Sequence, residues 1–208
     1  IVFAGVEFMG ESAKLLSPNK TVLMPDANAD CPMAHMVDER FINNMREQYD
    51  DLCVVCYINS TAKIKTLSDV CVTSSNAKKI VGALPNKNIL FIPDQNLGRH
   101  IAKMFPEKNF LFCDGHCPSH YQITVEDLKK AKAAHPNAPI LIHPECKPEC
   151  VALSDYAGST SGIIDYATND NEHDEFIVVT EVGVIHEMEK QNPNKKFYLA
   201  SEKLVCPN

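Results

Sequence analysis

Nine cysteines are the residues of this 208-residue chain with the greatest capacity to bind a metal or act as nucleophiles. An odd number does not suit a closed set of disulfides, so we expect reduced thiols. Reduced thiols have three common uses, namely metal or cluster ligation, catalysis and packing in a core. The cysteines are Cys31, Cys53, Cys56, Cys71, Cys113, Cys117, Cys146, Cys150 and Cys206.

The spacing Cys53-x-x-Cys56 is similar to a zinc or redox knuckle, but the apolar residues around it predict a strand. Positions i and i+3 of a strand face opposite sides of the sheet, so one site cannot easily use both thiols. We interpret Cys53 and Cys56 as buried core thiols. Cys71 falls in the middle of another expected strand, and the same interpretation applies to it.

Two arrangements could bring distant thiols together. Cys113-x3-Cys117 and Cys146-x3-Cys150 could form a four-thiolate zinc site, because an x3 spacing is permitted. The other arrangement takes one cysteine after each of three separate α/β segments. It would hold a cubane iron–sulfur cluster with one iron left open as a Lewis acid, and its ligands would be Cys31, Cys117 and Cys206. Spacing alone does not decide between the two.

Hydroxyl, amide, imidazole and carboxyl side chains gather just after expected strands. Ligands of open α/β sheets bind beyond the carboxyl ends of the strands, so these side chains are candidates for one binding face. A glutamate close to a histidine can serve as a general base, although His143-Pro144-Glu145 alone would pass for a surface turn. The candidates are Tyr57, Asn59, Ser74, His120, His143 and Glu145.

The run Gly158-Ser159-Thr160-Ser161-Gly162 combines small residues, hydroxyl groups and free backbone N–H groups before an expected helix. Such a run can cradle a phosphate or carboxylate, with Ser159 and Thr160 as donors. Taken alone, the same run is a loop with helix-capping residues. Ser74 could similarly donate a hydrogen bond to a ligand through its hydroxyl group, or it could be the N-cap residue of a helix.

The elements that must position these residues are strands alternating with helices, which predicts an α/β fold with mostly parallel sheets. Thr124 followed by Asp127 predicts a capped helix start. The expected strands cover residues 21–24, 53–57, 69–73, 88–92, 110–113, 140–143, 175–180 and 196–200. The expected helices cover residues 33–49, 60–66, 76–83, 98–104, 124–135, 148–155, 160–169 and 182–191.

A short sequence motif, Pro-Asn-Lys, recurs at residues 18–20, 85–87 and 193–195, each time before an expected apolar strand. Pro25-Asp26-x-Asn28 and Pro93-Asp94-x-Asn96 then follow two of those strands. The recurrence favours duplicated α/β modules over chance use of a common turn dipeptide.

Composition narrows the classes of function. The 20 basic and 27 acidic residues give a net charge of −7, which argues against a nucleic-acid-binding surface. No apolar run is long enough for a membrane span, and we expect a cytoplasmic protein. Because the chain begins at Ile1 without a methionine, we also expect it to be a fragment of a longer protein.

An ordered set of short motifs is more specific than any of these features. The set resembles the quinolinate synthase family, the enzymes of NAD biosynthesis that join iminoaspartate to dihydroxyacetone phosphate, over essentially all 208 residues. The motifs are Pro25-Asp26-x3-Asp30-Cys31, Tyr57-Ile58-Asn59-Ser60, Thr73-Ser74-Ser75-Asn76-Ala77, Pro93-Asp94-x-Asn96-Leu97-Gly98, Gly115-x-Cys117-Pro118-x-His120, His143-Pro144-Glu145-Cys146, Gly158-Ser159-Thr160-Ser161-Gly162, Thr180-Glu181 and Cys206-Pro207-Asn208.

The resemblance implies repeated three-layer α/β modules with short parallel sheets, arranged around a pseudo-threefold axis. It implies a remnant of a first domain at residues 1–34 with 205–208, a second domain at 35–119 and a third at 120–204. It also implies a [4Fe–4S] cluster as cofactor, with Cys31, Cys117 and Cys206 as ligands and Cys146 not among them.

The substrates that the resemblance implies are small anions, iminoaspartate and dihydroxyacetone phosphate, and the products include phosphate and water. An aspartate-oxidising enzyme would supply the iminoaspartate. The family's N-terminal segment and C-terminal helices fall outside these residues, so we do not expect this stretch alone to be active. The alternatives are a zinc-stabilised α/β binding module and a non-catalytic fragment. The implied catalytic residues are Glu145, His143, His120 and Tyr57, and the implied substrate-binding residues are Tyr57, Asn59, Ser74, His143, Glu145, Ser159 and Thr160.

Overall fold

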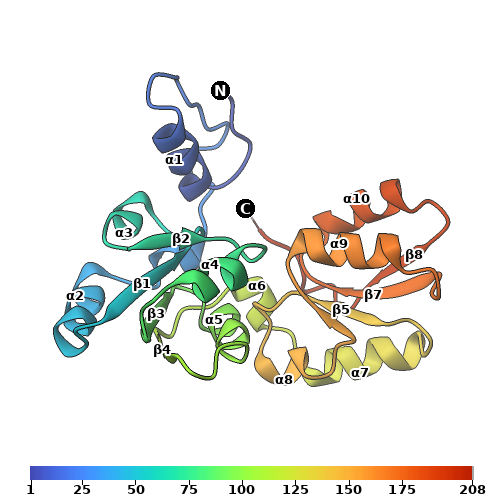
Figure 1. Ribbon diagram of the computed structural model, residues 1–208. Coiled ribbons are helices and arrows are strands. Elements are labelled where there is room, and N and C mark those ends of the chain that lie inside the picture. The colour runs from blue at the N-terminus through green and yellow to red at the C-terminus, as the bar shows by residue number, and fades with distance from the viewer. Residues whose placement is uncertain (208) are drawn as a thin grey trace. The chain divides into compact units, whose positions relative to one another are not determined.

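The computed structural model describes residues 1–207, which divide into two compact units. We call residues 1–116 the N-terminal unit and residues 117–207 the C-terminal unit. Each unit contains a four-stranded sheet whose strands all run parallel, as Figure 1 shows. The α/β fold class expected from the sequence is therefore confirmed.

The N-terminal unit begins with a helix and an irregular segment before its sheet. In chain order, its elements are α1 (Glu7–Leu16), a 3₁₀ turn (Pro32–His35), α2 (Glu39–Gln48), β1 (Leu52–Tyr57), α3 (Ala62–Thr66), β2 (Val70–Val72), α4 (Ala77–Ala83), β3 (Asn88–Ile92), α5 (Gln95–Ala102) and β4 (Asn109–Phe112).

The C-terminal unit begins with a short helix. In chain order, its elements are α6 (Pro118–Tyr121), α7 (Val125–Ala134), β5 (Ile140–Ile142), α8 (Pro148–Val151), β6 (Tyr156–Ala157), α9 (Thr160–Asn169), β7 (Glu175–Val179), α10 (Gly183–Gln191) and β8 (Lys196–Leu199). The expected capping box forms at the start of α7, where the Asp127 backbone N–H donates to Thr124 Oγ1 at 3.2 Å.

Helices cover both faces of the N-terminal sheet. On one face, Val54 of β1 and Leu90 of β3 pack with Ile42 of α2 and Ile64 of α3. On the other face α5 lies close to the sheet, because a Cβ on Gly98 would stand 2.9 Å from the ring of Phe91 and 2.8 Å from that of Phe112. Burial on both faces explains why β1 and β3 are continuous apolar runs in the sequence.

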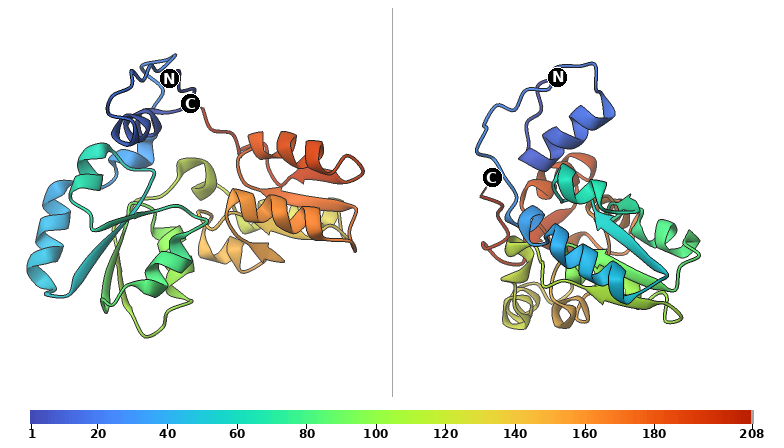
Figure 2. Two further views of the ribbon diagram at one scale, coloured as in Figure 1. Left: turned by 45° about the horizontal axis from the view of Figure 1, so that its top comes forward. Right: turned by 90° about the vertical axis from the view of Figure 1, so that its left-hand side faces the viewer.

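The C-terminal sheet is covered in the same way. Ile140 and Val179 pack with Leu128 of α7 on one face, whereas Leu141 and Val178 pack with Ile163 of α9 on the other. Figures 1 and 2 show α7 and α8 on one side of this sheet and α9 and α10 on the opposite side. The unit is therefore a three-layer α/β module.

The two sheets have the same topology. Their strand orders are β2-β1-β3-β4 and β6-β5-β7-β8, so β1 corresponds to β5, β2 to β6, β3 to β7 and β4 to β8. One detail repeats before the second strand of each module. Asp69 Oδ2 accepts from the Val54 backbone N–H at 2.7 Å, and Asp155 Oδ2 accepts from that of Ile140 at 2.7 Å. The modules are thus repeated in their side-chain contacts as well as in their topology.

Several expected elements differ from the observed ones. Residues 21–24 form only an isolated bridge between Leu23 and Val2, not a strand. The expected helix over residues 33–49 is broken, because Asp38 is extended and its Oδ1 accepts from the Phe41 backbone N–H at 2.8 Å, capping a new helix. Helices α1 and α6 and the two-residue strand β6 were not expected.

Gly115 is required by a close approach in the loop between β4 and α6. A Cβ at this position would stand 2.2 Å from the Pro93 carbonyl oxygen, and backbone cannot yield as a side chain can. We expect Gly115→Ala to lower the free energy of unfolding by about 1–3 kcal/mol, measured by urea titration. Gly82→Ala in α4 is the control, because the added Cβ meets only the side chain of Phe105, at 3.1 Å. Equal stabilities of the two variants would contradict this account.

Candidate functional site

Polar side chains from three elements meet inside the C-terminal unit. His120 lies on α6, His143 and Glu145 follow β5, and Thr180 follows β7. None of the four is more than 6% exposed. Burial of four polar residues requires that they satisfy one another, since an unpartnered buried polar group is costly. The sequence placed His143 and Glu145 after a strand, and their burial contradicts the surface-turn alternative.

Glu145 connects the two histidines. Its Oε2 lies 2.9 Å from His120 Nδ1 and 3.6 Å from His143 Nδ1. The ring centroids of the two histidines are 5.1 Å apart. The structure therefore brings together three of the four residues that the sequence predicted to be catalytic, namely His120, His143 and Glu145.

Hydrogen bonds determine how the rings are oriented. The Glu145 backbone N–H donates to His143 Nδ1 at 3.3 Å, which assigns the proton of a neutral His143 ring to Nε2. His120 Nε2 lies 3.0 Å from Thr180 Oγ1. In a neutral His120 ring that donates from Nδ1 to the Glu145 carboxylate, Nε2 accepts from the Thr180 hydroxyl.

Cys117 adjoins this cluster. It is the N-cap residue of α6, it is half-buried, and its Sγ lies 3.2 Å from His120 Nδ1. Pro118 occupies the first helical position, where the missing backbone N–H has no consequence. Cys117, His120 and Glu145 each offer one ligand atom, and these three atoms lie within 4.8 Å of one another. The three residues form a group that could hold a metal ion.

The chain that carries Cys206 is anchored beside α6. The Ser119 hydroxyl donates to the Val205 carbonyl oxygen at 3.2 Å, and the Val182 backbone N–H donates to the Leu204 carbonyl at 2.9 Å. Leu204 is completely buried in the core, whereas Cys206 is exposed. Ser119, two residues after Cys117, is therefore in direct contact with Val205, the residue before Cys206.

Cys31 lies in the N-terminal unit, directly before the 3₁₀ turn, and is half-buried. Its backbone N–H donates to Asp30 Oδ1 at 2.7 Å, and Asp30 Oδ2 lies 2.7 Å from His35 Nε2. Glu7, Asp30 and His35 form a second grouping that could hold a metal. These three residues were not among the predicted site residues.

The remaining predicted residues of the N-terminal unit lie at the carboxyl ends of its strands. Tyr57 is the last residue of β1 and is 6% exposed, and Asn59 follows it, half-buried. Ser74 lies half-buried in the turn after β2. It is not the N-cap of α4, because that position belongs to Asn76.

Ser159 and Thr160 stand at the start of α9, as expected. Ser159 is the N-cap, and its Oγ accepts from the Gly162 backbone N–H at 3.1 Å. Thr160 is exposed at the first helical position. The turn with Ser159 and the turn with Ser74 occupy equivalent places, since each follows the second strand of its module.

The other cysteines do not form the four-thiolate zinc site. Cys146 and Cys150 are completely buried in the core, and Cys150 Sγ donates to the Ile123 carbonyl oxygen at 3.6 Å. Burial raises the pKa of Cys150 to about 11, which keeps it a neutral thiol. Within residues 117–207, Cys117, Cys146 and Cys150 do not form a metal-holding group. The zinc-module alternative is not favoured.

The interpretation of Cys53 and Cys56 as buried thiols is confirmed. They also face opposite sides of the sheet, since only Cys56 belongs to the core beneath α2 and α3. The same interpretation of Cys71 is wrong, because Cys71 is exposed. The reason is its position on β2, which is an edge strand of the N-terminal sheet.

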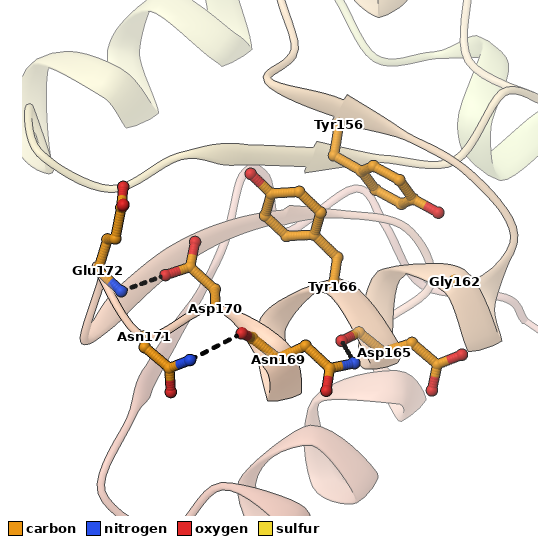
Figure 3. Close-up of a pocket in the computed structure, with 8 residues that line it drawn as sticks. All are labelled: Tyr156, Gly162, Asp165, Tyr166, Asn169, Asp170, Asn171 and Glu172. Carbon is orange, nitrogen blue, oxygen red and sulfur yellow. Dashed lines mark hydrogen bonds between the residues drawn. The ribbon is translucent and has the colours of Figure 1, made fainter.

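A cavity of about 580 Å³ lies beside α9, and its lining includes none of the residues of the histidine cluster (Figure 3). Tyr156 and Tyr166 stack along it with their ring centroids 4.8 Å apart. Several polar groups of this cavity form hydrogen bonds within the loop after α9. For example, Asp170 Oδ1 accepts from the Glu172 backbone N–H at 2.7 Å. Gly162 is its only lining residue from the hydroxyl-rich run, so this cavity is not the predicted site.

Comparison with known proteins identifies the family. A family model described as "Quinolinate synthetase A protein" matches residues 1–208. The chain is 56% identical over 206 residues to "Quinolinate synthase" of Clostridioides difficile (strain 630), covering 99% of this chain and 67% of that protein. It belongs to the quinolinate synthase family.

Further relatives agree with this assignment to the quinolinate synthase family. "Quinolinate synthase" of Caldicellulosiruptor bescii is 52% identical over 208 residues, which is 100% of this chain and 68% of that protein. "Quinolinate synthase" of Fusobacterium nucleatum subsp. nucleatum is 53% identical over 206 residues, which is 99% of this chain and 68% of that protein. Within residues 1–207, none of the helices has the length and apolar character needed to cross a membrane.

Proposed function

We propose that this protein catalyses the condensation of iminoaspartate with dihydroxyacetone phosphate to quinolinate, with release of phosphate and water. The observation that carries the proposal is the position of Cys117 beside the buried His120–Glu145–His143 cluster, at the carboxyl ends of β5 and β7. Ligand sites of parallel sheets lie at that edge. Family membership supplies the reaction.

We propose further that the protein carries a [4Fe–4S] cluster held by Cys31, Cys117 and Cys206. Two of these cysteines occupy equivalent places, since Cys117 follows β4 and Cys206 follows β8, the fourth strands of the repeated sheets. Neither lies in a core, and the Ser119–Val205 contact keeps their segments together. The thiolates of these cysteines are therefore suitable ligands for the iron atoms of such a cluster. When bound, the cluster would supply one iron with an open position as a Lewis acid.

Glu145 is proposed as the general base. A carboxylate can remove a proton from carbon next to a carbonyl or imine, as enolisation and ring formation require. Its Oε2 lies 2.9 Å from His120 Nδ1, and the hydrogen bond that His120 donates there holds the carboxylate in position to accept a proton from substrate. Exclusion of water by burial strengthens the charge interactions that govern this transfer.

His143 is proposed to bind and protonate oxygen atoms of the substrates, and His120 is proposed to position the carboxylate of Glu145. With Nδ1 of His143 accepting from the Glu145 backbone, the ring presents Nε2–H as a hydrogen-bond donor. His120 is held at both nitrogens, by Glu145 and by Thr180, which limits it to one orientation. Loss of water would be assisted by a donor that protonates the departing hydroxyl group.

Hydroxyl and amide groups are proposed to bind the anionic ends of the substrates. Ser159 and Thr160 stand at the N-terminus of the ten-residue helix α9, where backbone N–H groups and the helix dipole favour anions. Tyr57, Asn59 and Ser74 would add donors from the N-terminal unit, which requires this unit to contribute to the same site.

The resemblance to the family implies the domain arrangement that we propose, and the repeated sheet topology supports the similarity of two of its domains. Residues 35–119 and 120–204 would be the second and third of three similar domains around a pseudo-threefold axis, with residues 1–34 and 205–208 belonging to the first. An aspartate-oxidising enzyme would supply iminoaspartate, which is an unstable imine in water.

The test of this function is product formation by the complete protein that carries this sequence. The anaerobically purified protein is supplied with dihydroxyacetone phosphate and with iminoaspartate made in place by an aspartate oxidase. Quinolinate is measured by mass spectrometry. Formation of quinolinate that depends on both substrates is expected, and consumption of neither substrate by protein with a full iron content would overturn the proposal.

The anion-binding role of α9 can be separated from helix capping. Thr160→Val should reduce kcat/KM by roughly 10- to 150-fold, because a hydrogen bond to a charged group contributes about 1.5–3 kcal/mol. Its stability should hardly change. Thr124→Ala at the cap of α7 is the matched control, which should lose about 1 kcal/mol of stability with unchanged kinetics. Unchanged kinetics in both Thr160→Val and Ser159→Ala would leave only a capping role for this run.

A further inference from the structure

Cys56 and Cys71 form a thiol pair that the proposed reaction does not use. The two residues are direct register partners on β1 and β2. These strands are parallel neighbours in the sheet (Figure 1). Neighbouring strands lie about 4.8 Å apart, and register partners in a parallel pair present their side chains on the same face. Disulfides in proteins join Cα atoms about 4.4–6.8 Å apart. The backbone therefore already has a spacing that a disulfide accepts.

The two thiols differ in access. Cys56 is completely buried in the core beneath α2 and α3, whereas Cys71 is exposed because β2 is at the edge of the sheet. An oxidant in solution can therefore reach Cys71 first. Cys56 lies behind it as the second thiol, which is the arrangement of an attacking and a resolving cysteine.

The surroundings favour the thiolate form of Cys71. Hydrogen bonding by the Cys56 thiol and the nearby Lys65 ammonium group lower the pKa of Cys71 to about 6, in spite of its partial burial. The same hydrogen bond and burial raise the pKa of Cys56. Lys65 is held in place from α3, where its Nζ donates to Ser12 Oγ at 2.7 Å. The thiolate is the reactive form of cysteine, so Cys71 is the nucleophile of the pair.

We propose that Cys56 and Cys71 are a reversible disulfide site, oxidised by small-molecule disulfides such as oxidised glutathione. The Cys71 thiolate attacks one sulfur of the disulfide, forms a mixed disulfide and releases one thiolate. The Cys56 thiol then loses its proton and attacks the Cys71 sulfur, and the second thiolate leaves. The two protein thiols are oxidised, and one glutathione disulfide is reduced to two glutathione thiols. The bond would tie the three-residue edge strand β2, and the Ser74 turn that follows it, to the centre of the sheet.

The test is peptide mapping of the complete protein after anaerobic incubation with oxidised glutathione. Thiols that remain are alkylated, and the digest is analysed by mass spectrometry without reduction. We expect a peptide pair joined through Cys56 and Cys71 that dithiothreitol separates. The joined pair should be lost in Cys71→Ser and retained in Cys53→Ser, whose substituted thiol is on the opposite face of β1.

The unmodified protein alone can overturn the inference, so the result does not depend on how well the variants fold. A digest in which Cys71 carries glutathione but is not joined to Cys56 would show that the buried thiol cannot resolve the mixed disulfide. A digest in which both thiols are alkylated after full exposure to oxidised glutathione would show that Cys71 is not reactive.

Discussion

Cys117→Ser is expected to abolish retention of the iron–sulfur cluster while the C-terminal unit keeps its fold. A serine hydroxyl is a poor ligand for iron compared with a thiolate, so a cluster held at three points would keep only two thiolates. Cys117 lies at the N-cap of α6 and is half-buried, where serine is a favoured residue. Iron and sulfide analysis and the visible absorbance near 400 nm of anaerobic protein measure the loss. Cys31→Ser and Cys206→Ser should give the same result.

Two other cysteines provide the controls for this experiment. Cys71→Ser changes an exposed thiol in the N-terminal unit and should leave the iron content unchanged. Cys146→Ser places a hydroxyl in a completely buried position, so it should cost about 1–3 kcal/mol of stability and still retain iron. Complete cluster loss in Cys146→Ser together with a normal cluster in Cys31→Ser would contradict the ligand assignment.

Glu145→Gln should keep the fold and the cluster and reduce turnover by about 10²–10⁴-fold, the usual contribution of a general base. Glutamine has nearly the same shape, and its amide oxygen can still accept from His120 Nδ1, which lies 2.9 Å from Oε2. It cannot accept a proton from substrate at neutral pH. The measurement is the rate of quinolinate formation, normalised to iron content.

The matched control for this carboxyl group is Glu149→Gln in α8, an exposed glutamate four residues along the chain. It should leave both the rate and the iron content unchanged. A near-normal rate in Glu145→Gln would mean that the buried carboxylate only orients the two histidines.

The inner strands β1, β3, β5 and β7 were predictable because burial on both faces leaves a continuous apolar run. Strand β3 was predicted to the residue at Asn88–Ile92, and helix α9 at Thr160–Asn169. Helix α6 was missed because four residues starting at a proline carry no periodic pattern. Asp38 could have revealed the start of α2, since it is an N-cap residue followed by a glutamate.

The duplication was predicted from the Pro-Asn-Lys motif, but this motif does not occupy equivalent positions in the two modules. Pro-Asn-Lys at 85–87 precedes β3 and that at 193–195 precedes β8, which are the third and fourth strands of their modules, whereas that at 18–20 precedes only the bridge at Leu23. A motif that does occupy equivalent positions is Leu-Ser-Asp, at Leu67-Ser68-Asp69 and at Leu153-Ser154-Asp155. Its aspartate accepts a backbone hydrogen bond from the first strand of each module. A search for repeated triplets just before a strand would have found it.

The site was predictable in its residue types and not in its contacts. His120, His143 and Glu145 were chosen from their motifs, but the contact between His120 and Thr180 joins residues sixty positions apart. Thr180 was part of a quoted motif without a role, and its place directly after a buried strand was the available signal. Cys71 is exposed because β2 is an edge strand, and the order of strands in a sheet cannot be predicted from the pattern of apolar residues.

Metal and sulfide analysis of the complete protein after anaerobic purification tests the proposed cluster. We expect iron and acid-labile sulfide in the amounts of one [4Fe–4S] cluster per chain, with no bound zinc, and quinolinate formation in proportion to the iron content. Colourless protein with one zinc per chain and no sulfide would contradict the cluster, its three ligands and the reaction proposed for this site.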